Sequence, residues 1–125
     1  MQKGIVPPGL ESYTLLGDSY AVAGDYKDAV DAYGKAAPDA KTGEVDFKRG
    51  VMLQNLGRHS ESRTALQQAI AKGGFQRIGE AYLALGNADL ALKDKSGAVA
   101  AFKQAEQHAS TRTSAQNSLK QIGQK

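Results

Sequence analysis

Cysteine and tryptophan are both absent from this chain of 125 residues, and proline occurs only three times. Without cysteine there can be no disulfide, no thiolate zinc site and no cysteine nucleophile. No apolar run approaches the roughly 20 residues that are needed to span a bilayer, and residues 1–10 lack the apolar stretch of a signal peptide. We therefore expect no direct insertion of this chain into a membrane.

Clustered basic residues are missing as well. Residues 1–40 carry three basic and six acidic side chains, residues 41–72 carry six and three, and residues 73–125 carry seven and four. The basic residues have no stacking aromatics beside them, so nucleic acid is not an expected partner. The uneven charge has two interpretations: solvated helix surfaces, or attraction between the acidic N-terminal end of one copy and the basic C-terminal end of another.

Sets of residues for catalysis or metal binding are also absent from the sequence. Neither His59 nor His108 has a second histidine or a carboxylate at the i+4 spacing of a helical metal pair. Gly73-Gly74 lacks the Lys-Ser/Thr that completes a phosphate-binding loop. No motif combines a nucleophile, a base and oxyanion donors. We expect neither an enzyme nor a bound metal or cofactor.

What the sequence does contain is a sparse pattern that occurs three times. In each copy a glycine precedes a small residue by twelve positions, a large apolar residue comes four positions later, and an alanine three after that. The copies are Gly17, Ala29, Tyr33 and Ala36; Gly50, Ser62, Leu66 and Ala69; and Gly86, Ala98, Phe102 and Ala105. The pattern predicts helix pairs that cross closely at the glycines, with the large side chains filling the space between neighbouring pairs.

Helical periodicity and turn residues predict seven helices. Glycines at Gly24, Gly57 and Gly73-Gly74 end three of them, and Asp25 is a candidate N-cap for the second. Residues 1–9 are expected to be extended, because they contain two adjacent prolines. The predicted helices are 10–23, 26–37, 43–56, 59–72, 76–92, 96–108 and 111–122.

The last predicted helix differs from the others in being polar on all but one stripe. Ala115, Leu119 and Ile122 are spaced to cover the preceding helix, and Ser110 or Thr111 is its candidate cap. No equivalent helix is predicted before residue 10, which favours a fragment of a longer array or an oligomer. The predicted organisation is an N-terminal segment 1–9, three repeats over 10–110 (about 10–43, 43–76 and 79–110), and a capping helix with tail over 111–125.

The repeated pattern resembles that of the tetratricopeptide repeat (TPR) family. The resemblance implies an all-α, right-handed superhelix of three helix-turn-helix repeats with a C-terminal capping helix, used as a protein-interaction module. The second repeat departs from the family, because Asp46 stands at the usual aromatic position and Arg49 at the usual leucine position. The proline typical of the repeat end is replaced in each copy, by Lys41, Gly74 and Ser110.

The segments Gly79–Gly86 and Ala98–Phe102 resemble more narrowly the C-terminal repeats of exported proteobacterial TPR proteins that occur with TonB–ExbB–ExbD systems. Those proteins commonly have tryptophan before the leucine of the final helix, where this chain has Ser118. The resemblance implies a periplasmic location and a partner in an envelope complex. The alternative is a cytoplasmic location.

In a TPR stack, the first helix of each repeat lines a concave groove. Counted from the glycines, the predicted groove residues are Glu11, Thr14, Asp18 and Ala21; Phe47, Val51, Gln54 and Asn55; and Leu83, Asn87 and Leu90. We predict that a protein or peptide binds there, with Phe47 and Leu83 as apolar anchors, unless these two simply pack against each other. Asp18 would repel a terminal carboxylate. The competing hypothesis is head-to-tail self-association through the uncapped first repeat.

Overall fold

The computed structural model describes residues 9–123, and all the regular secondary structure within that range is helical. Short 3₁₀ turns, η1 (Ala37–Asp39) and η2 (Ala109–Thr111), follow α2 and α6. The expected extended conformation of residues 1–8 and the last two residues of the tail lie outside the described range. The helices are α1 (Leu10–Ala23), α2 (Tyr26–Ala36), α3 (Glu44–Asn55), α4 (His59–Lys72), α5 (Ile78–Ala91), α6 (Lys95–Glu106) and α7 (Arg112–Gln121).

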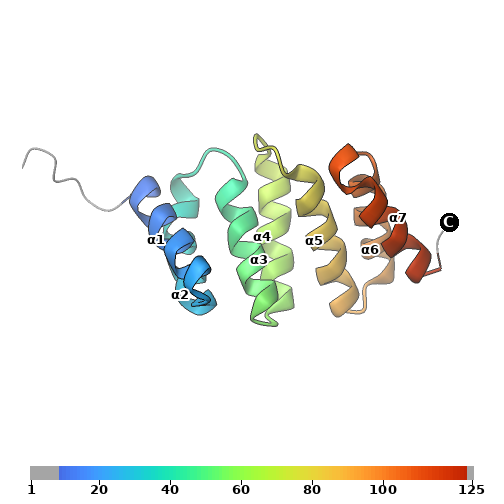
Figure 1. Cartoon of the computed structure of the whole chain (residues 1–125), viewed down its shortest axis with the longest axis horizontal. Helices are drawn as coiled ribbons and strands as arrows, with labels where there is room; N and C mark the ends of the chain where they lie inside the picture. Colours follow the sequence, from blue (N-terminus) through green and yellow to red (C-terminus); the bar gives the residue numbers. More distant parts are fainter. Residues whose placement is uncertain (1–8, 124–125) are drawn as a thin grey trace, which may run out of the picture.

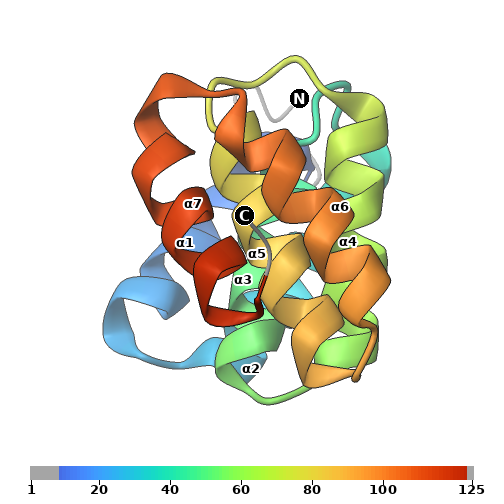
Figure 2. The same cartoon turned by 90° about the vertical axis from the view of Figure 1, so that its right-hand side faces the viewer.

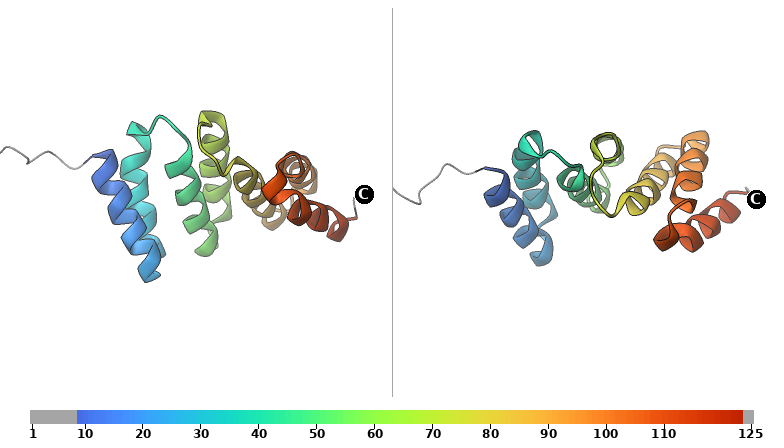
Figure 3. Two further views of the ribbon diagram at one scale, coloured as in Figure 1. Left: turned by 45° about the horizontal axis from the view of Figure 1, so that its top comes forward. Right: turned by 90° about the horizontal axis from the view of Figure 1, so that it is seen from above.

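The helices form two layers, which are clearest when the molecule is seen from above (Figure 3). The odd-numbered helices α1, α3 and α5 make one layer and the even-numbered helices α2, α4 and α6 the other (Figure 1). Each odd helix packs against the even helix that follows it, and each even helix also contacts the next odd one. Helix α7 covers α6 at the C-terminal end (Figure 2).

The predicted helix boundaries are confirmed to within two residues, and the turn glycines explain why. Gly24, Gly57 and Gly73 have φ angles of 82°, 75° and 63°, which side chains other than glycine rarely adopt. The proposed caps are wrong in detail. Asp25 and Thr111 occupy N-cap positions, but neither side chain caps its helix.

Thr111 fails to cap because its hydroxyl donates to the carbonyl of Ala105 at 2.7 Å and thereby ties α7 to α6. The capping hydrogen bond at α6 instead comes from Asp94, whose carboxylate accepts the N–H of Gly97 at 2.9 Å.

The three repeat glycines lie on the odd helices where the large residue of the same repeat presses against them. A Cβ on Gly17 would lie 2.5 Å from the Tyr33 ring, and one on Gly86 would lie 2.5 Å from the Phe102 ring. A Cβ on Gly50 would lie 2.8 Å from the Leu66 side chain. The predicted close crossings are therefore confirmed.

The same large side chains also reach the next helix pair. Leu66 packs in one cluster with Ala81 and Ala84 of α5, and Phe102 packs with Leu119 of α7. This confirms that they fill the space between neighbouring pairs, in addition to the space above the glycines.

The two ends of the stack differ. At the C-terminal end α7 buries Ala115 and Leu119 and exposes polar side chains. At the other end, Leu15 and Val22 of α1 are 61% and 91% exposed. Leu15 occupies the position that corresponds to Ala84 in α5, which is buried in the cluster around Leu66. The outer face of α1 is thus apolar where its counterpart in the third pair is covered.

Candidate peptide-binding groove

A hollow of about 410 Å³ lies along α3, between the first and third helix pairs. Helix α3 supplies most of its lining, α2 contributes an aromatic ring from one side, and the start of α5 contributes two charged groups from the other. The lining residues are Tyr33, Phe47, Lys48, Val51, Met52, Arg77 and Glu80. An apolar floor with charged groups of both signs at the rim is a typical arrangement for holding a peptide side chain.

Lys48 links the hollow to α1 through an ion pair. Its ammonium lies 3.1 Å from Oδ1 of Asp18, and the Tyr33 hydroxyl donates to the same oxygen at 2.5 Å. Burial, together with this hydrogen bond, raises the pKa of Tyr33 far above its ordinary value, so the phenol remains a donor at physiological pH. The charge of Asp18 is consequently balanced by Lys48, which weakens the repulsion that we expected it to exert on a carboxylate.

Phe47 forms the floor of the hollow and is only 5% exposed. The Arg77 guanidinium lies over its ring, 4.8 Å from the centroid, and the Phe75 ring lies 5.8 Å away. Leu83 packs in a different cluster, with Phe102 and Leu119. The interpretation that Phe47 and Leu83 pack against each other is therefore wrong, and the structure does not bring them together as paired anchors.

The other predicted groove residues fall in several places. Val51 joins Phe47 in the hollow, whereas Gln54 donates its amide to the carbonyl of Ala84 at 2.7 Å and so bridges α3 to α5. Glu11 and Thr14 line a separate hollow of about 480 Å³ near the start of α1. The rest lie elsewhere: Ala21 packs beside Tyr33, Leu90 packs beside Phe102, and Asn55 and Asn87 are exposed.

Sequence reasoning missed five residues of the hollow. Tyr33 was predicted only as a packing residue, and two of the other four, Lys48 and Met52, had a detectable signal. Lys48, Val51 and Met52 are spaced i, i+3 and i+4, so the choice of Val51 could have led to Lys48 and Met52 on the same side of α3. Arg77 precedes α5 and Glu80 lies in its first turn. Their approach to α3 depends on the path of the α4–α5 connection, for which periodicity gives no signal.

Among residues 9–123, no group of three or more histidine, aspartate or glutamate side chains could hold a metal ion. Within the same range, every helix is too short or too polar to cross a membrane.

Two tetratricopeptide repeat models match the sequence, one over residues 47–114 and the other over residues 10–37. The chain therefore belongs to the tetratricopeptide repeat family, and the expected all-α TPR superhelix is confirmed. Repeats of this family stack into extended concave surfaces that bind other proteins. No curated protein matches the sequence closely enough to count as a relative.

Several solved structures share the fold. A crystal structure of MamA superposes with a TM-score of 0.77 at 21% identity, over 85% of this chain and 61% of that one. A second MamA structure superposes with a TM-score of 0.73 at 25% identity, over 82% of this chain and 56% of that one. This chain thus spans about three fifths of the MamA length. The TPR2B domain of yeast Sti1, in a complex with pHsp70, superposes with a TM-score of 0.73 at 22% identity. The match covers 86% of this chain and 88% of that one.

Proposed function

We propose that the chain is a non-enzymatic interaction module that holds a peptide or a helix of a partner protein along α3. The observation that carries the proposal is the 410 Å³ hollow with Phe47 and Val51 at its base and Lys48, Arg77 and Glu80 at its rim. The yeast Sti1 domains, which share the fold, were solved as complexes with pHSP90 and pHsp70.

The hollow favours a partner segment with one apolar side chain flanked by polar groups. Val51 and Met52 are partly exposed and offer apolar contact. Arg77 and Glu80 are 47% exposed, and 4.0 Å separates Arg77 Nε from Glu80 Oε1, so both groups remain able to pair with charges on a peptide. A ligand therefore needs no single net charge, and its apolar anchor provides most of the affinity.

The experiment is selection of peptides from a random displayed library against the immobilised chain, followed by calorimetric titration of the enriched peptides. Val51→Glu places a charge in the apolar base, and we expect at least a tenfold loss of affinity. Lys103→Ala, on the exposed side of α6, serves as the matched control and should bind normally. Enriched peptides that bind the Val51→Glu variant as tightly as the parent would show that this hollow is not the site.

We further propose, on the resemblance of Gly79–Gly86 and Ala98–Phe102 to exported TPR proteins, that the partner belongs to a bacterial envelope complex and that the module works in the periplasm. Crosslinking in cells, followed by fractionation, tests this. Recovery of the chain and its crosslinked partners only in the cytoplasmic fraction would contradict it.

Self-association is a second candidate, and the exposed apolar face of α1 favours it. Leu15 and Val22 would be covered if α1 packed against another copy. Light scattering across a range of concentrations and salt tests this, with Leu15→Ser/Val22→Ser as the disrupting variant. A parent chain that stays monomeric at all concentrations and salt levels would exclude it.

A further inference from the structure

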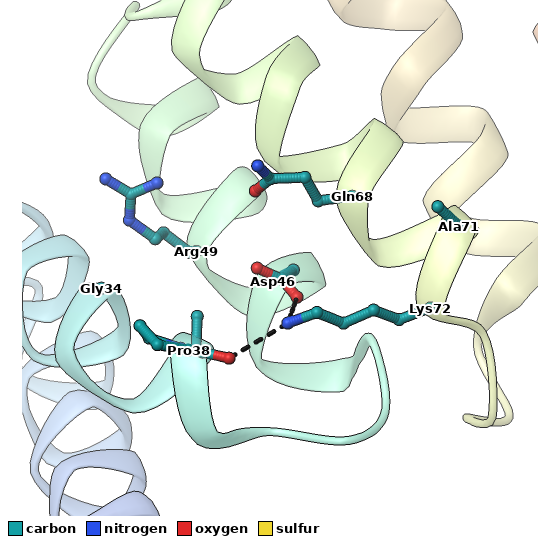
Figure 4. Close-up of a pocket in the computed structure, with 8 residues that line it drawn as sticks. Gly34, Pro38, Asp46, Arg49, Gln68, Ala71 and Lys72 are labelled. Atoms are coloured by element: carbon teal, nitrogen blue, oxygen red, sulfur yellow. Dashed lines mark hydrogen bonds and ion pairs between the residues drawn. The ribbon is translucent and has the colours of Figure 1, made fainter.

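A second hollow, of about 470 Å³, lies on the other side of α3, where α2, α3 and α4 meet. Helices α2, α3 and α4 and the η1 turn line it with alanine and proline side chains as well as charged and amide groups (Figure 4). The residues that matter to the argument are Gly34, Asp46, Arg49, Gln68 and Lys72.

Two departures of the second repeat from the family pattern place charged side chains in this hollow. Asp46 and Arg49 of α3 stand where α1 has Tyr13 and Leu16. In the first repeat these positions border a hollow of about 130 Å³ that only α1 and α2 line. In the second repeat they place a carboxylate and a guanidinium in the lining of a hollow that the preceding helix α2 also walls.

Of the three charged residues in the hollow, Asp46 and Lys72 form an ion pair with each other and Arg49 forms none within residues 9–123. Asp46 is 3% exposed, and its carboxylate lies 2.7 Å from the Lys72 ammonium. Lys72 also donates to the carbonyl of Ala37 at 3.0 Å, so its ammonium is held at the lower edge of the hollow (Figure 4). These two charges balance each other and leave Arg49 as the excess cation of the lining.

Arg49 has hydrogen-bonding capacity to spare. Its Nε is buried and has no hydrogen-bond partner among residues 9–123. The guanidinium lies beside α2 and away from Lys72, and the Gln68 amide extends from α4 in its direction (Figure 4). Because Nε is enclosed beside Gly34 while the side chain as a whole is partly exposed, an acceptor from outside the described chain would be held by the two terminal nitrogens of the guanidinium.

Gly34 makes the room for this guanidinium. A Cβ at that position would lie 3.3 Å from Arg49 Nε, closer than ordinary van der Waals contact. Helix α2 thus keeps a helix-weakening glycine in its interior where Arg49 approaches. The position is not one of the three repeat glycines, so the repeat pattern does not account for it.

We propose that this hollow binds a carboxylate, with the Arg49 guanidinium donating paired hydrogen bonds and the Gln68 amide donating a further one. The planar guanidinium matches a carboxylate in geometry. The charged lining residues carry a net charge of +1, which one carboxylate neutralises. A doubly charged phosphate is less suitable, because the fixed carboxylate of Asp46 repels the second charge. The volume lies within the range of small-molecule pockets.

The carboxylate has two possible sources, a small organic acid or the C-terminus of a peptide. Titration of the whole chain, followed by amide chemical shifts, separates them with three probes. These are succinate, a short peptide with a free C-terminus, and the same peptide with an amidated C-terminus. Inorganic phosphate is the competing anion. We expect succinate or the free peptide to shift amides around Arg49 and Gln68, and the amidated peptide to shift neither.

Two variants make the test specific. Arg49→Gln should weaken carboxylate binding at least tenfold, whereas Lys103→Gln removes one exposed positive charge elsewhere and should not change it. The double variant Asp46→Tyr/Arg49→Leu restores the residue types of the first repeat and fills the hollow. It should remain folded, since Lys72 is 31% exposed and keeps its hydrogen bond to the carbonyl of Ala37, and it should lose binding.

The proposal is overturned by any of three results. These are the absence of carboxylate binding at millimolar concentration, binding of phosphate as tight as that of carboxylates, and unchanged affinity in the Arg49→Gln variant. The groove along α3 is not altered by these variants, so loss of carboxylate binding with normal peptide capture at Val51 would separate this hollow from the proposed peptide site.

Discussion

The second and third repeats share an inner contact and differ at the positions around it. In both, a glycine of the first helix receives the large residue of the second, Leu66 over Gly50 and Phe102 over Gly86. On the first helix, four positions and one position before the glycine, the third repeat has Tyr82 and Leu85. The second repeat has the buried carboxylate of Asp46 and the guanidinium of Arg49 at the same positions. The stack therefore depends on the glycine contact, and the neighbouring positions can change from apolar to charged while the helices remain paired.

The comparison extends to the two buried aspartates. Asp46 of the second repeat has its ion-pair partner, Lys72, at 2.7 Å. Asp89 of the third repeat is 4% exposed and has Arg63 at 3.5 Å. Burial raises the pKa of Asp89 above its ordinary value, the hydrogen bond from Arg63 lowers it in part, and the charge of Asp94 raises it again. The third repeat thus combines apolar residues beside its glycine contact with the less compensated acid.

Phe102→Ala should have the largest effect on stability. The ring is fully buried and joins α6 to the capping helix, so its removal leaves a cavity and should cost about 3–5 kcal/mol. Leu66→Ala should cost less, since less volume is removed, and the exposed Lys103→Ala should change little. Urea denaturation measures all three. A larger loss for Leu66→Ala would contradict the expectation that the volume removed sets the order of the two losses.

Gly86→Ala should have the next largest effect. The new methyl would overlap the Phe102 ring and should cost about 1–3 kcal/mol. Gly34→Ala is the matched control for stability, because its methyl would meet only the Arg49 side chain, at 3.3 Å, which has to shift by a few tenths of an ångström, while the helix gains up to about 1 kcal/mol. Phe102→Leu, which copies the second repeat, should recover part of the loss in a double variant. Equal effects of Gly86→Ala and Gly34→Ala on urea stability would refute the role of the inner contact.

Asp89→Asn should have the smallest effect, visible only as a pH dependence. Because the pKa of Asp89 is raised in the folded chain, the folded state binds more protons than the unfolded state between the ordinary pKa and the raised one. Stability therefore falls as pH rises through that window. Thermal unfolding measured from acid to neutral pH should show that the decrease in stability with rising pH disappears in Asp89→Asn. The exposed control Asp39→Asn should still show this decrease. An unchanged profile in Asp89→Asn would contradict the raised pKa.

Much of the fold was predictable because it follows from local rules. The helix ends coincide with glycines that adopt positive φ, and the twelve-residue spacing from each glycine to its small partner positions the helix crossing. The candidate site was less predictable. Val51 and Phe47 were found by counting along α3, but Phe47 is covered by Arg77, which approaches from a different helix pair.

The sequence alone determined seven helices, their pairing and the absence of a disulfide, because spacing within one helix and the residues at its ends act over a few positions. Only the tertiary structure decided which side chains meet. It joined Lys48 to Asp18, separated Leu83 from Phe47, and opened the hollow beside Arg49. These outcomes depend on the distance between neighbouring helix pairs, which many side chains set together and no local pattern encodes.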